Sequence, residues 1–365
     1  MHQITHIVRG GLVAALLVVT AHGQASPGQK PSVANHFIET PAGWAHPRTA
    51  WGDPDLQGMW PISFVGSVPM ERCADEGGAR AGAPPCDLTK AFRTVEEYAA
   101  ALEAAGVAVD RHAVAIAEGN FGRALQSGIT DPTFPQRQTS LIMDPPNGKL
   151  PEMTAEGKRL SALMKSSWAL SGERQTWDWA TDFDSWDRCI TRGMPSSMMP
   201  FRYNNGMEIM QAPGYVVLNL EMVHEARVIP VDGRPRLSPA FKHYMGESRG
   251  RWEGNTLVIE TTNYKPGPSA TNIGVMGSPE GNRFPVSDKM RTTERLTRLN
   301  DGMMLYEITT EDPVVVTRPW TARFPLKLNP SYRWWEYACH EGNRAIPDYV
   351  SASRAERAKA LLPGR

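Results

Sequence analysis

The chain has 365 residues with 39 basic and 39 acidic side chains, so its formal net charge is zero. This balance argues against a nucleic-acid partner, because such binding depends on a basic surface that neutralises phosphates. At this length the chain can form one large domain or two smaller ones. Its 32 glycines and 30 prolines predict many turns.

The first residues have the pattern of a signal peptide. Arg9 supplies a positive charge, Leu12–Thr20 is apolar, and Ala21-His22-Gly23 is a small-residue cleavage site. The apolar run is shorter than the roughly 20 residues of a membrane span. We therefore predict that residues 1–23 are a removable signal peptide. The mature protein is predicted to be periplasmic or secreted, without stable membrane insertion.

Four cysteines follow this segment, and in an oxidising compartment an even number favours disulfides. Cys73 and Cys86 flank a loop rich in Gly, Ala and Pro, so they form the simplest pair. Cys189 and Cys339 would then join the start of the second half of the chain to its end. Free buried thiols remain the alternative for this second pair, because a sequence does not fix connectivity.

Residues 24–185 predict an irregular arm that wraps a domain and carries short helices. Thr94 and Glu97 form a capping box, which predicts a helix over Val95–Ala105. Thr154 can cap a second short helix. The apolar stripe of that helix would comprise Leu160, Leu163 and Met164.

Residues 186–345 have the pattern of a β domain, with short segments rich in β-branched and aromatic residues. The predicted strands are Gly206–Gln211, Tyr215–Ile229, Thr256–Thr262, Arg291–Leu299, Met303–Thr310, Thr321–Leu328 and Arg333–Cys339. Between several of them lie Asp-Gly and Gly-Asn pairs, which tolerate the positive φ that tight hairpins need. The predicted fold is mainly β (α+β). It is an antiparallel meander that forms a lipocalin-like barrel or a curved sheet.

Two further segments complete the predicted organisation. Lys265–Val286 is a long loop rich in Gly, Pro, Ser and Asn, and loops of this length often cover binding sites. Residues 346–365 predict a C-terminal helix, with a capping box of Ser353 and Glu356 at its start.

The predicted strand Tyr215–Ile229 carries the principal catalytic candidate. Alternation places His224 on its apolar face. If that face lines a packed core, His224 is an ordinary buried histidine. If the barrel encloses a cavity, His224 is the group best placed for proton transfer. Glu225 and Arg227 would point the other way, where a salt bridge is the first interpretation and substrate binding the second.

Tyr203 and Asn204 stand just before the first predicted strand. The amide can serve turn geometry, and the alternative is that both residues orient a substrate oxygen. His340 and Glu341 follow Cys339, so a disulfide there would fix their position. We expect His340 to assist catalysis and Glu341 to contact the substrate.

Arg249 and Trp252 lie in a segment of alternating charge, Glu247–Glu253. Ion pairs across a β ladder explain this alternation, and substrate binding is the alternative use of the two side chains. The histidines and carboxylates do not have the spacing of a helical zinc motif, so no metal site is predicted.

Several nucleotide and hydrolase motifs are missing from the sequence. It contains no Gly-x-Ser-x-Gly elbow, no Walker loop and no dinucleotide-binding Gly-x-Gly-x-x-Gly segment. These absences argue against serine hydrolases, nucleotide hydrolases and Rossmann enzymes. No cofactor is therefore predicted.

The C-terminal half resembles a large family of exported, mostly uncharacterised bacterial proteins. The segments that carry this resemblance are Tyr203–Gly206, Gln211–Tyr215, His224–Arg227, Asp232–Pro235, Ser248–Gly254, Thr261–Asn263, Glu311–Pro313, Pro319–Thr321 and Tyr337–Asn343. Pro54–Trp60 is similar to the family's opening segment. The resemblance implies export but no particular reaction.

Together these features predict an exported enzyme that acts on a small apolar or aromatic molecule by cofactor-free acid/base chemistry. The reaction would be that of a hydrolase, a lyase or an isomerase. The alternative is a lipocalin-like periplasmic binding or carrier protein without catalysis. A third interpretation, a cell-envelope interaction protein, would require a large exposed apolar patch. The sequence leaves the oligomeric state open.

Overall fold

The computed structural model describes residues 40–74, 86–103, 136–165, 167, 175–201, 203–267 and 284–361. The predicted signal peptide and most of the predicted covering loop, Lys265–Val286, lie outside these residues. Within them no helix is long and apolar enough to cross a membrane.

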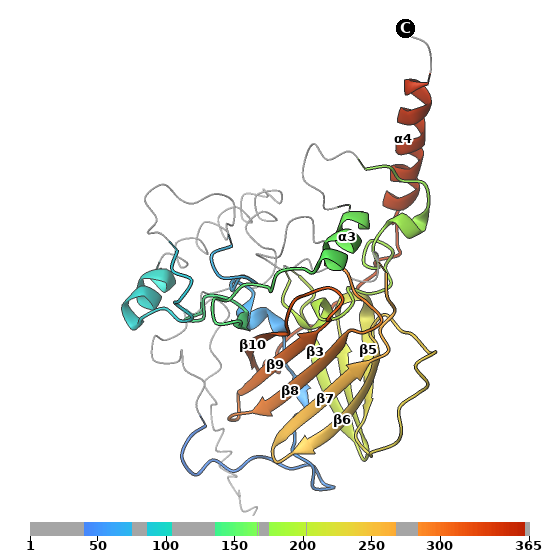
Figure 1. The fold of residues 1–365 in the computed structure, drawn as a ribbon. Helices are drawn as coiled ribbons and strands as arrows, with labels where there is room; N and C mark the ends of the chain where they lie inside the picture. Colours follow the sequence, from blue (N-terminus) through green and yellow to red (C-terminus); the bar gives the residue numbers. More distant parts are fainter. Residues whose placement is uncertain are drawn as a thin grey trace, which may run out of the picture.

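Two antiparallel sheets form the centre of the protein (Figure 1). The four-stranded sheet has the order β1 (Gly58–Met59), β3 (Met207–Ala212), β4 (Tyr215–Leu220) and β5 (Glu225–Pro230). The six-stranded sheet has the order β2 (Ile142–Asp144), β10 (Trp320–Lys327), β9 (Met303–Glu311), β8 (Arg291–Arg298), β7 (Thr256–Thr262) and β6 (Glu247–Glu253). The mainly β prediction is confirmed. In the described part of the chain the two sheets remain separate ladders, and no closed barrel is formed.

One hydrophobic core joins the two sheets. From the four-stranded sheet it includes Ile209, Val216 and Leu218, which are fully or almost fully buried. The six-stranded sheet contributes Leu257, Leu296, Tyr306 and Phe324, also fully buried. Alternation along each strand explains this arrangement, because every second side chain faces the partner sheet.

The N-terminal arm is part of both sheets. Its β1 pairs with β3, and its β2 pairs with β10 and forms the edge of the six-stranded sheet. Trp60, at the end of β1, is fully buried in the shared core. The arm thus contributes one strand to each sheet.

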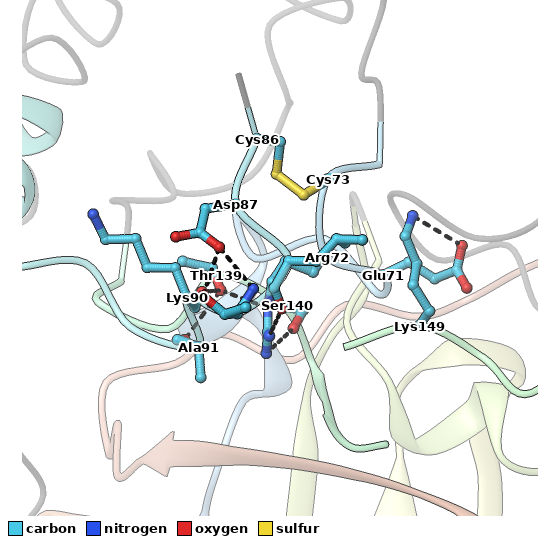
Figure 2. Close-up of a disulfide and its surroundings, with 12 residues drawn as sticks. Glu71, Arg72, Cys73, Cys86, Asp87, Lys90, Ala91, Thr139, Ser140 and Lys149 are labelled. Atoms are coloured by element: carbon cyan, nitrogen blue, oxygen red, sulfur yellow. Dashed lines mark hydrogen bonds and ion pairs between the residues drawn. A yellow bond between two sulfur atoms is a disulfide. The ribbon is translucent and has the colours of Figure 1, made fainter. Parts of the chain in front are cut away.

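Two segments of the arm meet at a buried arginine. Figure 2 shows Arg72 next to the Cys73–Cys86 disulfide, with its guanidinium directed at Thr139 and Ser140. Arg72 also donates to the backbone carbonyls of Leu88 and Pro146, at 2.6 and 2.7 Å. Its side chain is almost fully buried, so these bonds replace the water that it has lost. Arg72 therefore organises the arm together with the disulfide.

The predicted single strand Tyr215–Ile229 is wrong: the chain turns in its middle. β4 ends at Leu220 and β5 begins at Glu225, which pairs with Leu220 across the turn. Val223 and His224 have φ values of 60° and 40°. Such left-handed conformations are strained for residues other than glycine, and strongly so for a β-branched residue.

The buried carboxylate of Glu221 explains why the chain turns there. It accepts hydrogen bonds from Asn204 Nδ2 and the backbone N–H of Gly206, at 3.1 and 2.9 Å. It also accepts from the Tyr332 hydroxyl at 2.5 Å and the Trp335 N–H at 2.7 Å. Four donors to one buried carboxylate offset the strain of the turn.

The turn reverses which residues of the second strand face the core. Leu218 pairs with Arg227, so the two lie on the same face of the sheet. Arg227 is consequently buried, whereas Val228 is 57% exposed. His224 is exposed in the turn. The prediction that His224 lies on the apolar face of a strand is therefore wrong.

Two other strand predictions need correction. The predicted strand Arg333–Cys339 is irregular coil, held to the protein by the bonds from Tyr332 and Trp335 to Glu221. Glu247–Glu253 was predicted only as a charge-alternating segment, and it forms the edge strand β6. Its charges do pair across the ladder, as Arg251 with Glu260 shows at 2.7 Å.

The capping residues predicted the starts of the first two helices correctly, but the predicted apolar stripe of the second helix is only partly buried. Thr94 and Glu97 form the predicted capping box, and helical structure follows it through residue 103. α3 (Ala155–Leu163) begins after Thr154 as predicted, but its Leu163 is exposed. Instead, its Gly157 faces the backbone carbonyl of Val315, where a Cβ atom would lie only 2.1 Å from the oxygen.

α4 (Ala345–Ala360) begins next to the start of the predicted C-terminal helix, residues 346–365, but the predicted capping box at Ser353 is wrong, because the N-cap is Arg344. Ser353 is therefore inside the helix, where its buried hydroxyl accepts the N–H of Trp177 at 2.9 Å. Figure 1 shows α4 extending away from the sheets. The remaining short helices are the 3-10 turns η2 (Ile62–Val65), η3 (Ala180–Asp182), η4 (Ser196–Met198) and η5 (Met222–His224).

Both predicted disulfides are confirmed. Cys73 pairs with Cys86 across a separation of 13 residues, and Cys189 pairs with Cys339 across 150 residues. The second bridge ties the coil before α4 to the chain segment that enters the β domain.

Candidate functional site

The segment Asp184–Thr191 contributes to two pockets. Ile190 and Thr191 line the first, and Trp186 and Asp187 line the second. The backbone of this segment is shaped by Asp184, whose Oδ1 accepts the N–H groups of Trp186 and Asp187 at 2.8 and 2.9 Å. A short polar side chain that bonds the backbone two and three residues ahead is a common turn former.

The first pocket lies beside β5 and β6 and has a volume of about 440 Å³. Its polar groups bind one another: Thr191 Oγ1 donates to Glu225 at 2.5 Å, and Arg249 pairs with Glu247 at 2.5 Å. Burial raises the pKa of Glu225, while the Thr191 bond opposes that shift. The two carboxylates of this pocket, Glu225 and Glu247, are therefore already paired within the protein.

The second pocket has a volume of about 580 Å³ and lies where α4 begins. We call it the aromatic pocket. Its lining residues are Ser167, Phe183, Trp186, Asp187, Tyr203, Tyr337, Cys339, Glu341, Gly342, Asn343, Ala345, Ile346 and Tyr349. Its size is within the range of small-molecule sites, which combine apolar walls with a few polar groups.

The aromatic walls hold one another in place. Trp186 Nε1 donates to the Tyr337 hydroxyl at 3.1 Å. The rings of Tyr203 and Tyr337 are close to parallel, with centroids 6.4 Å apart and an interplanar angle of 14°. Phe201 packs edge-on against Trp186 and Tyr203, at centroid distances of 4.8 and 5.0 Å. Rings locked in this way form a rigid surface for a flat or apolar ligand.

Asp187 is the chemically distinctive member of the aromatic pocket. One oxygen, Oδ1, accepts from the Ser167 hydroxyl at 2.6 Å. The other, Oδ2, is buried and has no hydrogen-bond partner in the described part of the chain. Burial, together with the nearby Asp184 carboxylate, raises the pKa of Asp187 from 3.8 to about 6. A carboxyl group of this kind can take up and release a proton near neutral pH.

The Cys189–Cys339 disulfide positions both sides of the aromatic pocket. Beyond the bridge, Asn343 Nδ2 donates to the backbone carbonyl of Asp187 at 3.2 Å and contacts Cys189 Sγ at 3.3 Å. The bridge therefore brings the Tyr337–Asn343 coil against Asp187, although the two segments are about 150 residues apart in the chain.

The predicted catalytic residues separate in the structure. Tyr203 lines the aromatic pocket, and burial raises the pKa of its hydroxyl. His224 and His340 are exposed, and neither lines either of the two pockets. The geometry thus keeps one of the three predicted catalytic residues at the site.

The predicted substrate-binding residues also divide. Glu341 lines the aromatic pocket, whereas Glu225 and Arg249 line the first pocket. The predicted salt bridge between Glu225 and Arg227 is wrong, because Arg227 pairs with Glu294 inside the protein.

The other two predicted substrate-binding residues, Asn204 and Trp252, make contacts that stabilise the fold. Asn204 adopts a positive φ of 49° and donates to Glu221, which agrees with its interpretation as a turn residue. Trp252 is partly buried and packs against the main hydrophobic core. Neither side chain lines the two pockets.

Sequence reasoning missed Asp187. Its one signal is its position, two residues before Cys189 and next to Trp186. Across the described ranges, no group of three or more His, Cys, Asp or Glu side chains has the arrangement of a metal site.

Comparison with known proteins adds no assignment to this geometry. No family model matches the chain, and neither a curated protein nor a solved structure matches it.

Proposed function

We propose that this protein is an exported enzyme that acts on a small apolar or aromatic molecule in the aromatic pocket, with Asp187 as the proton-transfer group. The observation that carries the proposal is the Asp187 carboxyl, which lies in an aromatic pocket with one oxygen unpaired among the described residues and a pKa raised to about 6. General acid/base catalysis works best when the pKa of the group is close to the working pH.

The surroundings of Asp187 support this role. Ser167 holds Oδ1, which fixes the orientation of the carboxyl and directs proton exchange to Oδ2. Trp186 and Tyr337 provide flat walls for an apolar substrate. Two disulfides support the export that the N-terminal sequence predicts, since such bonds persist in oxidising compartments. Membership of the exported bacterial family described above belongs to the same proposal.

The test is a ligand-detected NMR screen of small aromatic compounds against the full chain, followed over time for product. We expect some compounds to bind the wild type and to bind the Trp186→Ala variant more weakly. The same compounds should be converted by the wild type but not by the Asp187→Asn variant. The conversion rate should change with pH around 6. Glu336→Gln, which alters an exposed carboxylate outside the pocket lining, is the matched control and should convert normally.

Two outcomes would contradict the proposal. Compounds that bind without conversion, with equal affinity for wild type and Asp187→Asn, would indicate a carrier protein. Conversion that persists unchanged in Asp187→Asn would remove Asp187 from the chemistry.

A further inference from the structure

We propose that the ligand of the aromatic pocket carries a positive charge of an organic ammonium type. This inference rests on the proposed function, because it concerns the substrate class of the same pocket. It follows from the charges and the rings that line the cavity.

The charged lining residues have one sign. Asp187 and Glu341 both carry carboxyl groups, and the lining residues that the structure describes include no lysine, arginine or histidine. A third carboxylate, on Asp184, lies behind Asp187 and is close enough to influence its ionisation. An anionic ligand would have to enter against these groups, whereas a cation would compensate them.

The walls are suited to a weakly hydrated cation. Five aromatic side chains line the cavity: Phe183, Trp186, Tyr203, Tyr337 and Tyr349. The faces of aromatic rings attract cations, and a cluster of such rings with a carboxylate is how proteins recognise quaternary ammonium groups. The protein already places one cation against this cluster, since the Arg192 guanidinium lies 5.1 Å from the ring centroids of both Trp186 and Phe201.

Three features oppose a cation, and none of them is a charge on a described lining residue. Arg192 carries a positive charge, but it is buried and does not line the pocket. Arg188 is close enough to lower the pKa of Asp187, but it does not line the pocket either. The first residues of α4, with the positive end of the helix dipole, also lie at the cavity. That end amounts to about half a charge, and Asp348 in the first turn of α4 compensates it. The charges on the described lining residues are thus the carboxylates of Asp187 and Glu341.

The test compares choline with 3,3-dimethylbutan-1-ol, a neutral molecule of the same shape, by quenching of tryptophan fluorescence and by calorimetry on the full chain. We expect choline to bind at least about tenfold more tightly than the alcohol, since loss of one close charge interaction changes affinity by about that factor. Glu341→Gln and Asp187→Asn should each weaken choline binding several-fold and leave the alcohol unaffected. Glu336→Gln should change neither.

The outcomes separate this inference from the proposed function. If the alcohol binds as tightly as choline, or if choline does not bind, the charge assignment is overturned. If neutral aromatic compounds are still converted in a reaction that needs Asp187, the proposed function stands without it. Because Glu341 is exposed, Glu341→Gln should fold normally, so the inference can be tested even if Asp187→Asn is unstable.

Discussion

Arg227 on β5 and Glu294 on β8 form a two-point ion pair between the two sheets, with nitrogen–oxygen distances of 2.9 and 2.5 Å. The side chains are only 3% and 0% exposed. Glu294 also accepts from the Tyr306 hydroxyl at 2.8 Å, and Arg227 donates to Ser248 Oγ at 3.3 Å. A buried polar cluster therefore lies within the hydrophobic core, and Arg227 Nε is its one atom without a hydrogen-bond partner among these described residues.

Removing one partner of this pair should destabilise the protein strongly. Glu294→Ala leaves the Arg227 guanidinium buried without its carboxylate, which costs about 3–5 kcal/mol in comparable pairs. Urea unfolding measures the change. The control is Glu260→Ala, which breaks two largely exposed pairs, with Arg251 and Arg236, and should cost about 1 kcal/mol or less for each pair. Equal effects of the two substitutions would show that the buried pair is not held as described.

Replacing Glu221 with glutamine should release the Tyr332–Trp335 segment. A glutamine side chain has one acceptor oxygen, and its other terminal group is an NH2 donor. Some of the four donors that now bind Glu221 would therefore face this NH2 group and lose their hydrogen bond. An unsatisfied buried donor costs about 1–3 kcal/mol. We expect faster hydrogen exchange at the Trp335 amide and a lower free energy of unfolding. Glu336→Gln, at the exposed residue that directly follows this segment, should change neither quantity.

The raised pKa of Asp187 makes the stability of the protein depend on pH. Because the pKa is higher in the folded state than in the unfolded chain, the folded state binds the proton more tightly. The associated stabilisation is complete below about pH 4 and is lost as the pH rises to about 6 and above. For a shift of about two units it amounts to at most about 3 kcal/mol.

The measurement compares wild type with Asp187→Asn by urea unfolding between pH 4 and 7, a range set by the two pKa values above. The free energy of unfolding of the wild type, relative to the variant, should fall as the pH rises. Parallel curves for the two proteins would mean that Asp187 titrates normally in the folded state.

The two disulfides should differ in their effects. Closing a longer loop restricts the unfolded chain more, by about 3 kcal/mol for a loop near 15 residues and about 4.7 kcal/mol for one near 100. Loss of Cys189–Cys339, which spans 150 residues, should therefore cost more than loss of Cys73–Cys86, which spans 13. Serine double variants and urea unfolding test this order.

Only the long-range bridge should affect the aromatic pocket. Cys339 lines the pocket and Asn343 contacts Cys189, so the Cys189→Ser/Cys339→Ser variant should expose Trp186 and shift its fluorescence to longer wavelength. The Cys73→Ser/Cys86→Ser variant is the matched control and should leave this fluorescence unchanged. A shift in both variants would indicate general loosening of the fold.

Local sequence signals predicted much of the secondary structure. Thr94 and Thr154 cap the helices that follow them, because their side-chain oxygens accept backbone N–H groups that the first turn leaves free. β7 has the predicted bounds, Thr256–Thr262, and it follows a Gly-Asn turn. These features depend on neighbours within a few residues, which is the range that a sequence pattern covers.

The candidate site was predicted only in part. Tyr203 and Glu341 lie in the aromatic pocket. Both were predicted from their positions in the chain, Tyr203 just before the first predicted strand and Glu341 shortly after Cys339. His224 lies elsewhere because the turn before it depends on donors from Asn204, Tyr332 and Trp335, which are distant in sequence. Alternation of side chains cannot anticipate a turn that such remote groups stabilise.

The sequence by itself determined the β character of the protein, its caps and turns, and the cysteines available for pairing. Only the tertiary structure decided that Arg227 would face the core, and that Asp187 would meet the Tyr337–Asn343 coil. The reason is physical. Caps and hairpins form from local hydrogen bonds, but the burial that raises the pKa of Asp187 comes from groups that the fold alone assembles.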